Sequence, residues 1–236
     1  MHLNKKEREK RLEELNFVFL EGGGVSMGTK SPIPCQVEKF RMNETPIRIR
    51  SVKSFWICKF TVSNIQFEKF NPRHHRPSTS DRDDDPVTDI TYGEATNYAK
   101  FLSEKSEIRF DLPTEKEWVF AAAPFGWEFF YQKEASPNIN KTHFFNPDEY
   151  HTLAVNDSRY EKNVYGLVLM GGNVVEMTKE IHKAKGHNGA IIDGSYYMGR
   201  GGGFGHCKLA SGSTNRRILF DIASRSTRVG FRLISR

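Results

Sequence analysis

Short apolar runs separated by polar and glycine-rich turns make up the first half of the chain. Residues 17–20, FVFL, are closely followed by a glycine triplet, which is the pattern of a short strand that enters a turn. Isoleucine and aromatic residues recur through residues 47–57 and predict a second extended stretch, broken near residues 51–54 by serine and lysine. Glycine-rich turns punctuate the last third of the chain, where we expect further extended structure.

Three capping boxes mark the starts of helices. In this motif a hydroxyl accepts a hydrogen bond from a backbone amide, and a carboxylate or amide three residues later reaches back to the first residue. The motif occurs at residues 63–66, 91–94 and 114–117. Apolar residues recur at helical spacing after the second and third boxes, so both helices are predicted to face a core, Trp118 included. Early helices followed by glycine-rich extended structure, without internal repeats, indicate an α+β domain.

The first sixteen residues, MHLNKKEREKRLEELN, form a charged amphipathic helix with Leu12 and Leu15 on one side. We expect this segment to be a helical extension, followed by a single domain over residues 17–236. It lacks the apolar centre of a secretory signal, so the expected location is the cytoplasm of the producing cell, or a virion. No stretch approaches the ~18 apolar residues of a membrane span, and no membrane insertion is expected.

Positive charge is concentrated in residues 200–236, which we call the tail. The formal net charge of the chain is +6, and the tail holds eight Lys and Arg against Asp221 alone. Such a segment suits phosphate or an acidic partner. The arginines, however, are spaced among Gly and Ser, which favours bracing of loops by bidentate hydrogen bonds. We therefore predict bracing and no nucleic-acid partner.

Several motifs occur in a fixed order along the chain. They are FLEGGGVSMG at 19–28, FWICKFTVSN at 55–64, PVTDITYGEA at 86–95, LPTEKEW at 112–118, GNVVE at 172–176, RGG at 200–202 and GFRL at 230–233. Their order is similar to that in the formylglycine-generating-enzyme (sulfatase-modifying) family, and the likeness covers roughly residues 17–234. The resemblance implies a C-type-lectin-like fold, irregular and loop-rich, with a few capped helices and short antiparallel strands.

The cysteines depart from the pattern of the family's oxidases. Those members hold copper with two cysteines a few residues after RGG, whereas this chain has only Cys207 there. The other two, Cys35 and Cys58, form no CxxC pair. A lone thiol does not supply a two-thiolate copper site, so the oxidase chemistry is predicted to be missing. The related sulfoxide synthases add an iron-binding helical domain for which there is no room here, and the histidines are interpreted as surface residues.

Calcium binding remains an alternative at one residue of the GNVVE motif. In the family, an acidic or amide side chain three residues before GNVxE, backbone carbonyls and the glutamate of that motif supply oxygen ligands. Glu176 is that glutamate, but Leu169 occupies the earlier position. Asn173 and Glu176 are more simply interpreted as closing a turn through hydrogen bonds to backbone, and the acidic residues 83–85 as a solvated loop. We therefore expect no cofactor, with calcium at Glu176 as the alternative.

The tail resembles a particular group within this fold. Variable proteins of diversity-generating retroelements adopt it, and adenine-directed mutagenesis rewrites their last several dozen residues. Their tails combine RGG and an aromatic residue, variable positions, arginines and GFRL, as the tail does here. Scrambling the adenines of an AAC or AAT codon never gives Lys, Glu, Gln, Met or Trp. These five types number 49 of the 236 residues, yet Lys208 alone represents them in the last 38.

The residue types of the tail suit contact with a ligand. They mix apolar, polar and charged side chains, with neither the alternation of a buried strand nor a helical repeat, between the RGG and GFRL motifs. Phe220 and Arg217 are types expected at energetic hot spots, although core packing is an equal alternative for Leu219 and Phe220. The candidate ligand-binding residues are His206, Leu209, Asn215, Arg217, Leu219, Phe220, Ser224, Ser226, Thr227 and Arg228.

These observations predict a non-catalytic receptor or display protein that binds a protein or a glycan through residues 204–228, within a variable region at 200–236. The alternative is a divergent metal-dependent oxidase or sulfoxide-forming enzyme that uses another set of ligands. A third interpretation is a non-catalytic scaffold subunit that uses the fold for assembly.

Overall fold

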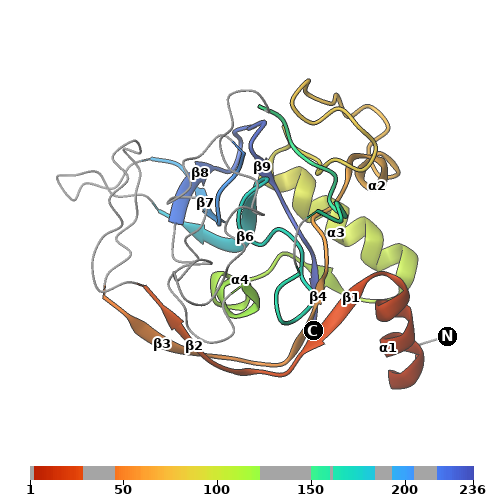
Figure 1. Ribbon diagram of the computed structural model, residues 1–236, viewed down its shortest axis with the longest axis vertical. Helices are drawn as coiled ribbons and strands as arrows, with labels where there is room; N and C mark the ends of the chain where they lie inside the picture. The colour runs from red at the N-terminus through yellow and green to blue at the C-terminus, as the bar shows by residue number, and fades with distance from the viewer. Residues whose placement is uncertain (1–2, 29–45, 123–149, 160–161, 184–192, 205–216) are drawn as a thin grey trace.

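The computed structural model describes residues 3–28, 46–122, 150–159, 162–183, 193–204 and 217–236. Within these ranges the chain forms four helices and ten short strands (Figure 1). The strands make up two four-stranded sheets and one two-stranded ribbon. This is the predicted α+β architecture with short strands. None of the helices in the described part of the chain is long and apolar enough to cross a bilayer.

The first sheet joins the beginning, the middle and the end of the chain. Its strands lie in the order β1 (Phe17–Leu20), β4 (Phe55–Cys58), β10 (Ile234–Ser235) and β5 (Phe110–Asp111), and all neighbours are antiparallel. The predicted strand at 17–20 and the break near 51–54 are confirmed, because β3 (Arg48–Val52) and β4 are separate strands. Since β10 lies between β4 and β5, the sheet is complete only when the last residues are in place.

The N-terminal helix α1 (Lys5–Glu14) packs as part of the domain. Leu12 is fully buried in the main hydrophobic cluster, whereas Leu15 at the helix end is partly exposed. The Arg8 guanidinium donates hydrogen bonds to the Ser235 hydroxyl oxygen at 2.8 Å and to the Arg236 carbonyl at 2.7 Å. The predicted helix is confirmed, and these contacts join it to the end of the chain beside the first sheet.

The second sheet is built largely from the tail and from the segment that precedes it. Its order is β8 (Arg217–Asp221), β7 (Tyr196–Arg200), β6 (Val175–His182) and β9 (Val229–Gly230), with β6 and β9 parallel and the other pairs antiparallel. Two of the four strands, β8 and β9, therefore belong to the tail. Residues 222–228, which we call the tail loop, connect them.

The three predicted capping boxes are all present, at the starts of α2 (Asn64–Glu68), α3 (Tyr92–Ser106) and α4 (Glu115–Ala122). At α3, the Thr91 amide donates to Glu94 at 2.7 Å, and the Glu94 amide donates to the Thr91 hydroxyl at 3.2 Å. These local motifs satisfy amides that a helix start leaves without partners, so they place the three helices independently of tertiary contacts.

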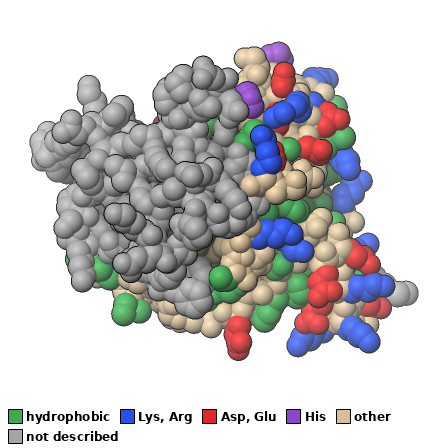
Figure 2. All heavy atoms as spheres, viewed as in Figure 1, with side chains coloured by type: hydrophobic (Ala, Val, Ile, Leu, Met, Phe, Trp, Pro, Cys, Tyr) green, Lys and Arg blue, Asp and Glu red, His purple; other side chains and the backbone are tan. Residues whose placement is uncertain are grey.

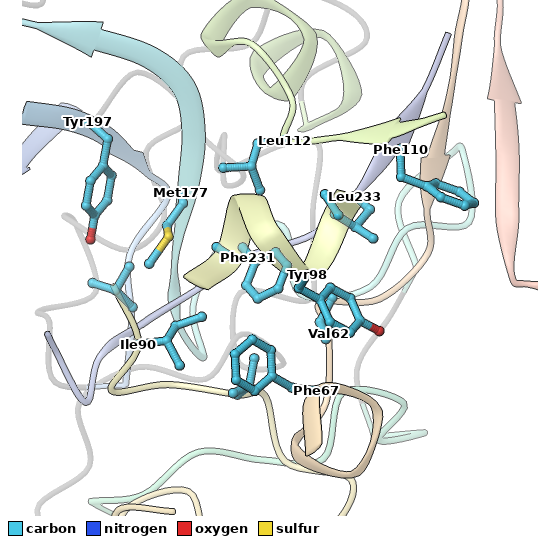
Figure 3. Close-up of a cluster of buried hydrophobic side chains, with 14 of the residues drawn as sticks. Val62, Phe67, Ile90, Tyr98, Phe110, Leu112, Met177, Tyr197, Phe231 and Leu233 are labelled. Carbon is cyan, nitrogen blue, oxygen red and sulfur yellow. The ribbon is translucent and has the colours of Figure 1, made fainter. Parts of the chain in front are cut away.

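Aromatic side chains from distant segments meet in the main hydrophobic cluster (Figure 3). Phe231 from the end of the chain packs edge-on against Phe67 of α2 and Tyr98 of α3, with ring centroids 6.4 and 5.7 Å apart. Leu233 lies in the same cluster. The GFRL motif thus supplies core packing, while α2 and α3 provide the opposite wall.

A second cluster lies between α4 and the ribbon of β2 (Gly23–Met27) and β3. Its largest member is Trp118, which is 0% exposed, as the helical pattern predicted. The indole nitrogen donates to Glu176 of β6 at 2.8 Å. Trp118 therefore links the helix to the second sheet through both packing and a hydrogen bond.

We expect Trp118→Ala to lower the free energy of unfolding by about 3–5 kcal/mol, because it removes a fully buried ring and leaves a Glu176 oxygen with one donor fewer. Chemical denaturation of the purified variant measures this. Ile49→Ala is the matched control, since Ile49 is 76% exposed and its loss should change stability by less than about 0.5 kcal/mol. Equal effects of the two substitutions would contradict this packing.

Candidate functional site

A buried ion pair holds the end of the tail. Arg232 is 0% exposed, and its guanidinium donates to both oxygens of Glu176 at 2.7 Å. The same guanidinium donates to the carbonyls of Cys58, Lys59 and Val168. Each charge is thereby compensated within the core, which is the condition under which a buried ion pair is tolerated.

A second buried carboxylate holds the start of the tail. Glu115, the first residue of α4, accepts from Arg200 at 2.6 Å and from Arg217 at 2.8 Å, and His182 Nε2 lies 3.1 Å from its other oxygen. Burial alone would raise the pKa of Glu115, but the hydrogen bond of His182 and the charges of Arg200 and Arg217 hold that pKa well below its usual range. The carboxylate is thus ionised and ties α4 to β6, β7 and β8.

The tail loop is held at a third place. Arg225 donates to the Asp89 carbonyl at 2.7 Å and to the Glu94 carboxylate at 3.0 Å, while the Asp89 amide donates to the Ser226 carbonyl at 2.9 Å. These bonds fix the loop against the start of α3. The predicted bracing role is confirmed for the described tail arginines other than Arg228, which contacts the Tyr150 side chain. Those that bind carboxylates are Arg200, Arg217, Arg225, Arg232 and Arg236.

The predicted ligand-binding residues divide into two groups. His206, Leu209 and Asn215 lie outside the described residues. The others lie on β8 or the tail loop and are partly buried: Arg217, Leu219, Phe220, Ser224, Ser226, Thr227 and Arg228. The described candidates therefore lie on one stretch of chain, residues 217–228. The ion pair of Arg217 with Glu115 holds one end of this stretch, and the ion pair of Arg232 with Glu176 follows the other end.

Several of these side chains have partners within the domain. Arg217 binds Glu115, and Phe220 stacks on Tyr197 with ring centroids 5.5 Å apart, on the side of β8 that packs against the core. The Ser224 hydroxyl donates to the Asp221 carbonyl at 2.7 Å. For Phe220, core packing is therefore the role the contacts show, while Arg217 braces the sheet.

Arg228 lies in an aromatic cluster at the surface. Its guanidinium lies 5.5 Å from the centroid of the Tyr150 ring and donates to the Tyr150 hydroxyl. The exposed Tyr150 ring packs edge-on against the buried Phe204, with centroids 5.1 Å apart. Sequence analysis included Arg228 but missed Tyr150, because no motif links residue 150 to the tail and only the fold brings them together.

The acidic and turn residues differ in part from expectation. Asn173 does close a turn, since its side chain exchanges hydrogen bonds with the backbone of Leu153 at 2.9 and 3.0 Å. Glu176 binds side chains, not backbone. The prediction of a solvated loop is wrong for Asp85, which is buried and paired with Arg82, and right for the two residues before it.

The calcium alternative at Glu176 gains no support from these contacts. Its oxygens already accept three hydrogen bonds from Arg232 and Trp118. A cation there would face the Arg232 guanidinium across the same carboxylate. Among the described residues, no group of three or more His, Cys, Asp or Glu side chains has the arrangement of a metal site.

The cysteines offer one described thiol. Cys58 lies in β4, and burial raises the pKa of its thiol, so it remains protonated and a weak nucleophile near pH 7. Cys35 and Cys207 lie outside the described residues. Among the described residues, the one thiol is therefore an unreactive one.

Short, mostly antiparallel strands, capped helices and a tail held by buried arginines define an α+β domain with the C-type-lectin-like fold. The sequence profile described as "Sulfatase-modifying factor enzyme 1-like domain" matches residues 3–236, so the chain belongs to this family. The match includes α1, in agreement with its packing. No curated protein matches the chain in sequence.

Solved structures share the fold over nearly the whole chain. PvdO from Pseudomonas aeruginosa is 22% identical with a TM-score of 0.71, covering 93% of each chain. Treponema denticola variable protein 1 is 16% identical with a TM-score of 0.74, covering 93% of this chain and 94% of its own. CarF is 18% identical with a TM-score of 0.67, covering 94% and 98%. The structural likeness shows a shared fold, and identities this low show nothing beyond it.

We expect Glu115→Gln to cost about 3–5 kcal/mol of stability at pH 7, because it removes the buried negative charge that Arg200 and Arg217 share. The pKa of Glu115 is lowered by folding, so its contribution is present above the usual value near 4.5 and is lost as the pH falls below it. Denaturation curves from pH 7 to pH 3 should show the difference between wild type and variant shrinking. A constant difference would contradict the assignment.

Proposed function

We propose that this protein is a non-catalytic ligand-binding protein that presents residues 204–228 to a protein or a glycan. The observation that carries the proposal is the contrast within the tail. Arg200 and Arg232 are buried and ion-paired at its ends, whereas the side chains of Leu219, Thr227 and Arg228 between them are partly exposed.

Rigid support favours recognition because fewer conformations are lost when the ligand binds. Its described part, residues 217–228, is fixed by β8 pairing with β7, by β9 pairing with β6, and by Arg225 in the tail loop. Binding residues are commonly carried on loops held by such a scaffold. The proposal therefore needs no movement of the domain for the surface to form.

The cluster of Arg228 and Tyr150 is the proposed centre of the binding surface. Arg and Tyr are enriched at energetic hot spots of interfaces, since each offers a large contact area together with hydrogen-bonding groups. Tyr150 is supported from below by the buried Phe204, which limits its freedom before binding. A partner with carboxylate, hydroxyl or amide groups would match this chemistry.

We propose further that a retroelement diversifies the tail. The near-absence of five residue types there supports it, and the shared fold with a protein named as a variable protein agrees with it. The decisive observation is the DNA beside the gene. A reverse transcriptase gene and a near-copy of the 3′ coding end, differing at adenines, would support the proposal, and flanks without such a copy would overturn it.

Tolerance to substitution should separate the exposed tail from its supports. In a codon-randomised library sorted for folded protein, we expect broad acceptance at Ser224, Thr227 and Arg228, because exposed positions usually change stability by less than about 0.5 kcal/mol. Arg200, Gly230 and Arg232 should be strongly depleted. A Cβ at Gly230 would lie 3.0 Å from the Val87 carbonyl oxygen, and both arginines compensate buried carboxylates. Equal depletion of both sets would indicate a tail that serves only as core.

The oxidase alternative predicts copper binding, and our proposal does not. We expect purified protein to retain far less than one copper per chain and to leave a cysteine-containing sulfatase-type peptide unoxidised, because the one described thiol, Cys58, is buried with a raised pKa. Elemental analysis and mass spectrometry of the peptide measure these quantities. Stoichiometric copper together with peptide turnover would favour the enzyme.

A further inference from the structure

A polar pocket lies beside the tail loop, where Arg225 forms part of its lining. It has a volume of about 330 Å³, which is at the lower end of the range for small-molecule sites. Charged and histidine side chains gather in the region of α2 and the segment after it (Figure 2). The lining residues are Asn71, Arg73, His74, His75, Asp89, Glu94 and Arg225.

One wall of the pocket is already neutral. Arg225 and Glu94 form an ion pair with nitrogen–oxygen distances of 2.9 and 3.0 Å, and Arg225 also donates to the Asp89 carbonyl. Glu94 caps α3 through Thr91 as well. These groups are therefore fixed before a ligand arrives, and their charges cancel each other.

Other lining side chains have donors and acceptors that form no bond to the described part of the protein: Asp89, Arg73 and His75. Among the described residues, none donates to the Asp89 carboxylate, and none accepts from the side chains of Arg73 or His75, both of which are exposed. The His74 ring packs edge-on against Phe67, 5.3 Å between centroids, which fixes its orientation. Burial lowers the pKa of His74, so its ring is neutral near pH 7.

The charges left without partners are one anion, Asp89, and one fixed cation, Arg73. An anionic ligand would meet Asp89 and Glu94, and a cationic ligand would meet Arg73 and Arg225, so neither has a net attraction. The lining contains no aliphatic side chain, which disfavours an apolar ligand. A neutral ligand that both donates and accepts hydrogen bonds is the chemistry that satisfies these groups.

We infer that this pocket binds one neutral, hydroxyl-rich sugar residue. Hydroxyl groups donate to Asp89 and accept from Arg73, His75 and the Asn71 amide. The site shares only Arg225 with the tail, so the inference goes beyond the proposed function and does not depend on the surface around Arg228. It adds a second recognition element next to the first.

The experiment uses the whole protein and defined probes. The methyl glycosides of glucose, galactose, mannose and N-acetylglucosamine are titrated in saturation-transfer NMR, alongside N-acetylneuraminic acid, inorganic phosphate and methylammonium. We expect saturable binding of at least one neutral glycoside and weaker binding of every charged probe. Asp89→Asn should raise the dissociation constant of that glycoside at least about tenfold, because a hydrogen bond to a charged acceptor is replaced by a weaker one.

Asp84→Asn is the matched control, since Asp84 is an exposed aspartate outside the pocket, and it should leave the dissociation constant unchanged. Unaltered thermal melting of Asp89→Asn excludes misfolding as the cause. The inference is overturned if no neutral glycoside binds, if a charged probe binds more tightly, or if Asp89→Asn has no effect. The inference is also overturned if Arg228→Ala loses glycoside binding while Asp89→Asn still binds as the wild type does. That result would place the glycoside at the surface around Arg228 and leave the proposed function intact.

Discussion

The buried pair of Arg232 and Glu176 is the contact on which the other parts of the domain depend. It joins the last segment of the chain to β6, and the Trp118 indole adds α4 to the same carboxylate. Arg232 reaches the backbone after β4 as well, so one guanidinium connects both sheets. A side chain of either residue left alone would be an unpaired charge in the core, so each of these elements stabilises the others through the pair.

This arrangement lets one stretch of sequence serve two purposes. Arg200, Arg217 and Arg225 each bind a carboxylate that belongs to an earlier helix, so the tail is attached along its length. Between and beside these attachments, Ile218 and Phe220 pack in the core, whereas Leu219, Thr227 and Arg228 are only partly buried. Substitutions at such partly exposed positions usually change stability little.

Local features of the fold were predictable, and long-range pairings were not. The capping boxes need only four consecutive residues, so the starts of α2, α3 and α4 could be identified from sequence. Glu115 and Arg200 are 85 residues apart, and Arg225 and Glu94 are 131 apart. Composition shows that the tail arginines need acidic partners, but it does not identify those partners. Residues so far apart in sequence become neighbours only when the sheets form.

The candidate site was predictable to a similar extent. Residue types and motifs indicated the tail as a surface, but β8 lacks a clean alternation because both of its faces meet protein groups: Phe220 meets Tyr197, and Arg217 meets Glu115. Tyr150 and the pocket residue Asp89 could not be assigned, since their relation to the tail depends on chain segments that are remote in sequence.

The position of β10 between β4 and β5 has a consequence for the order in which the domain folds. The first sheet cannot close until Ile234 and Ser235 join strands that lie more than a hundred residues earlier in the chain. Pairing over such a separation is slow, because the intervening chain has to be ordered first.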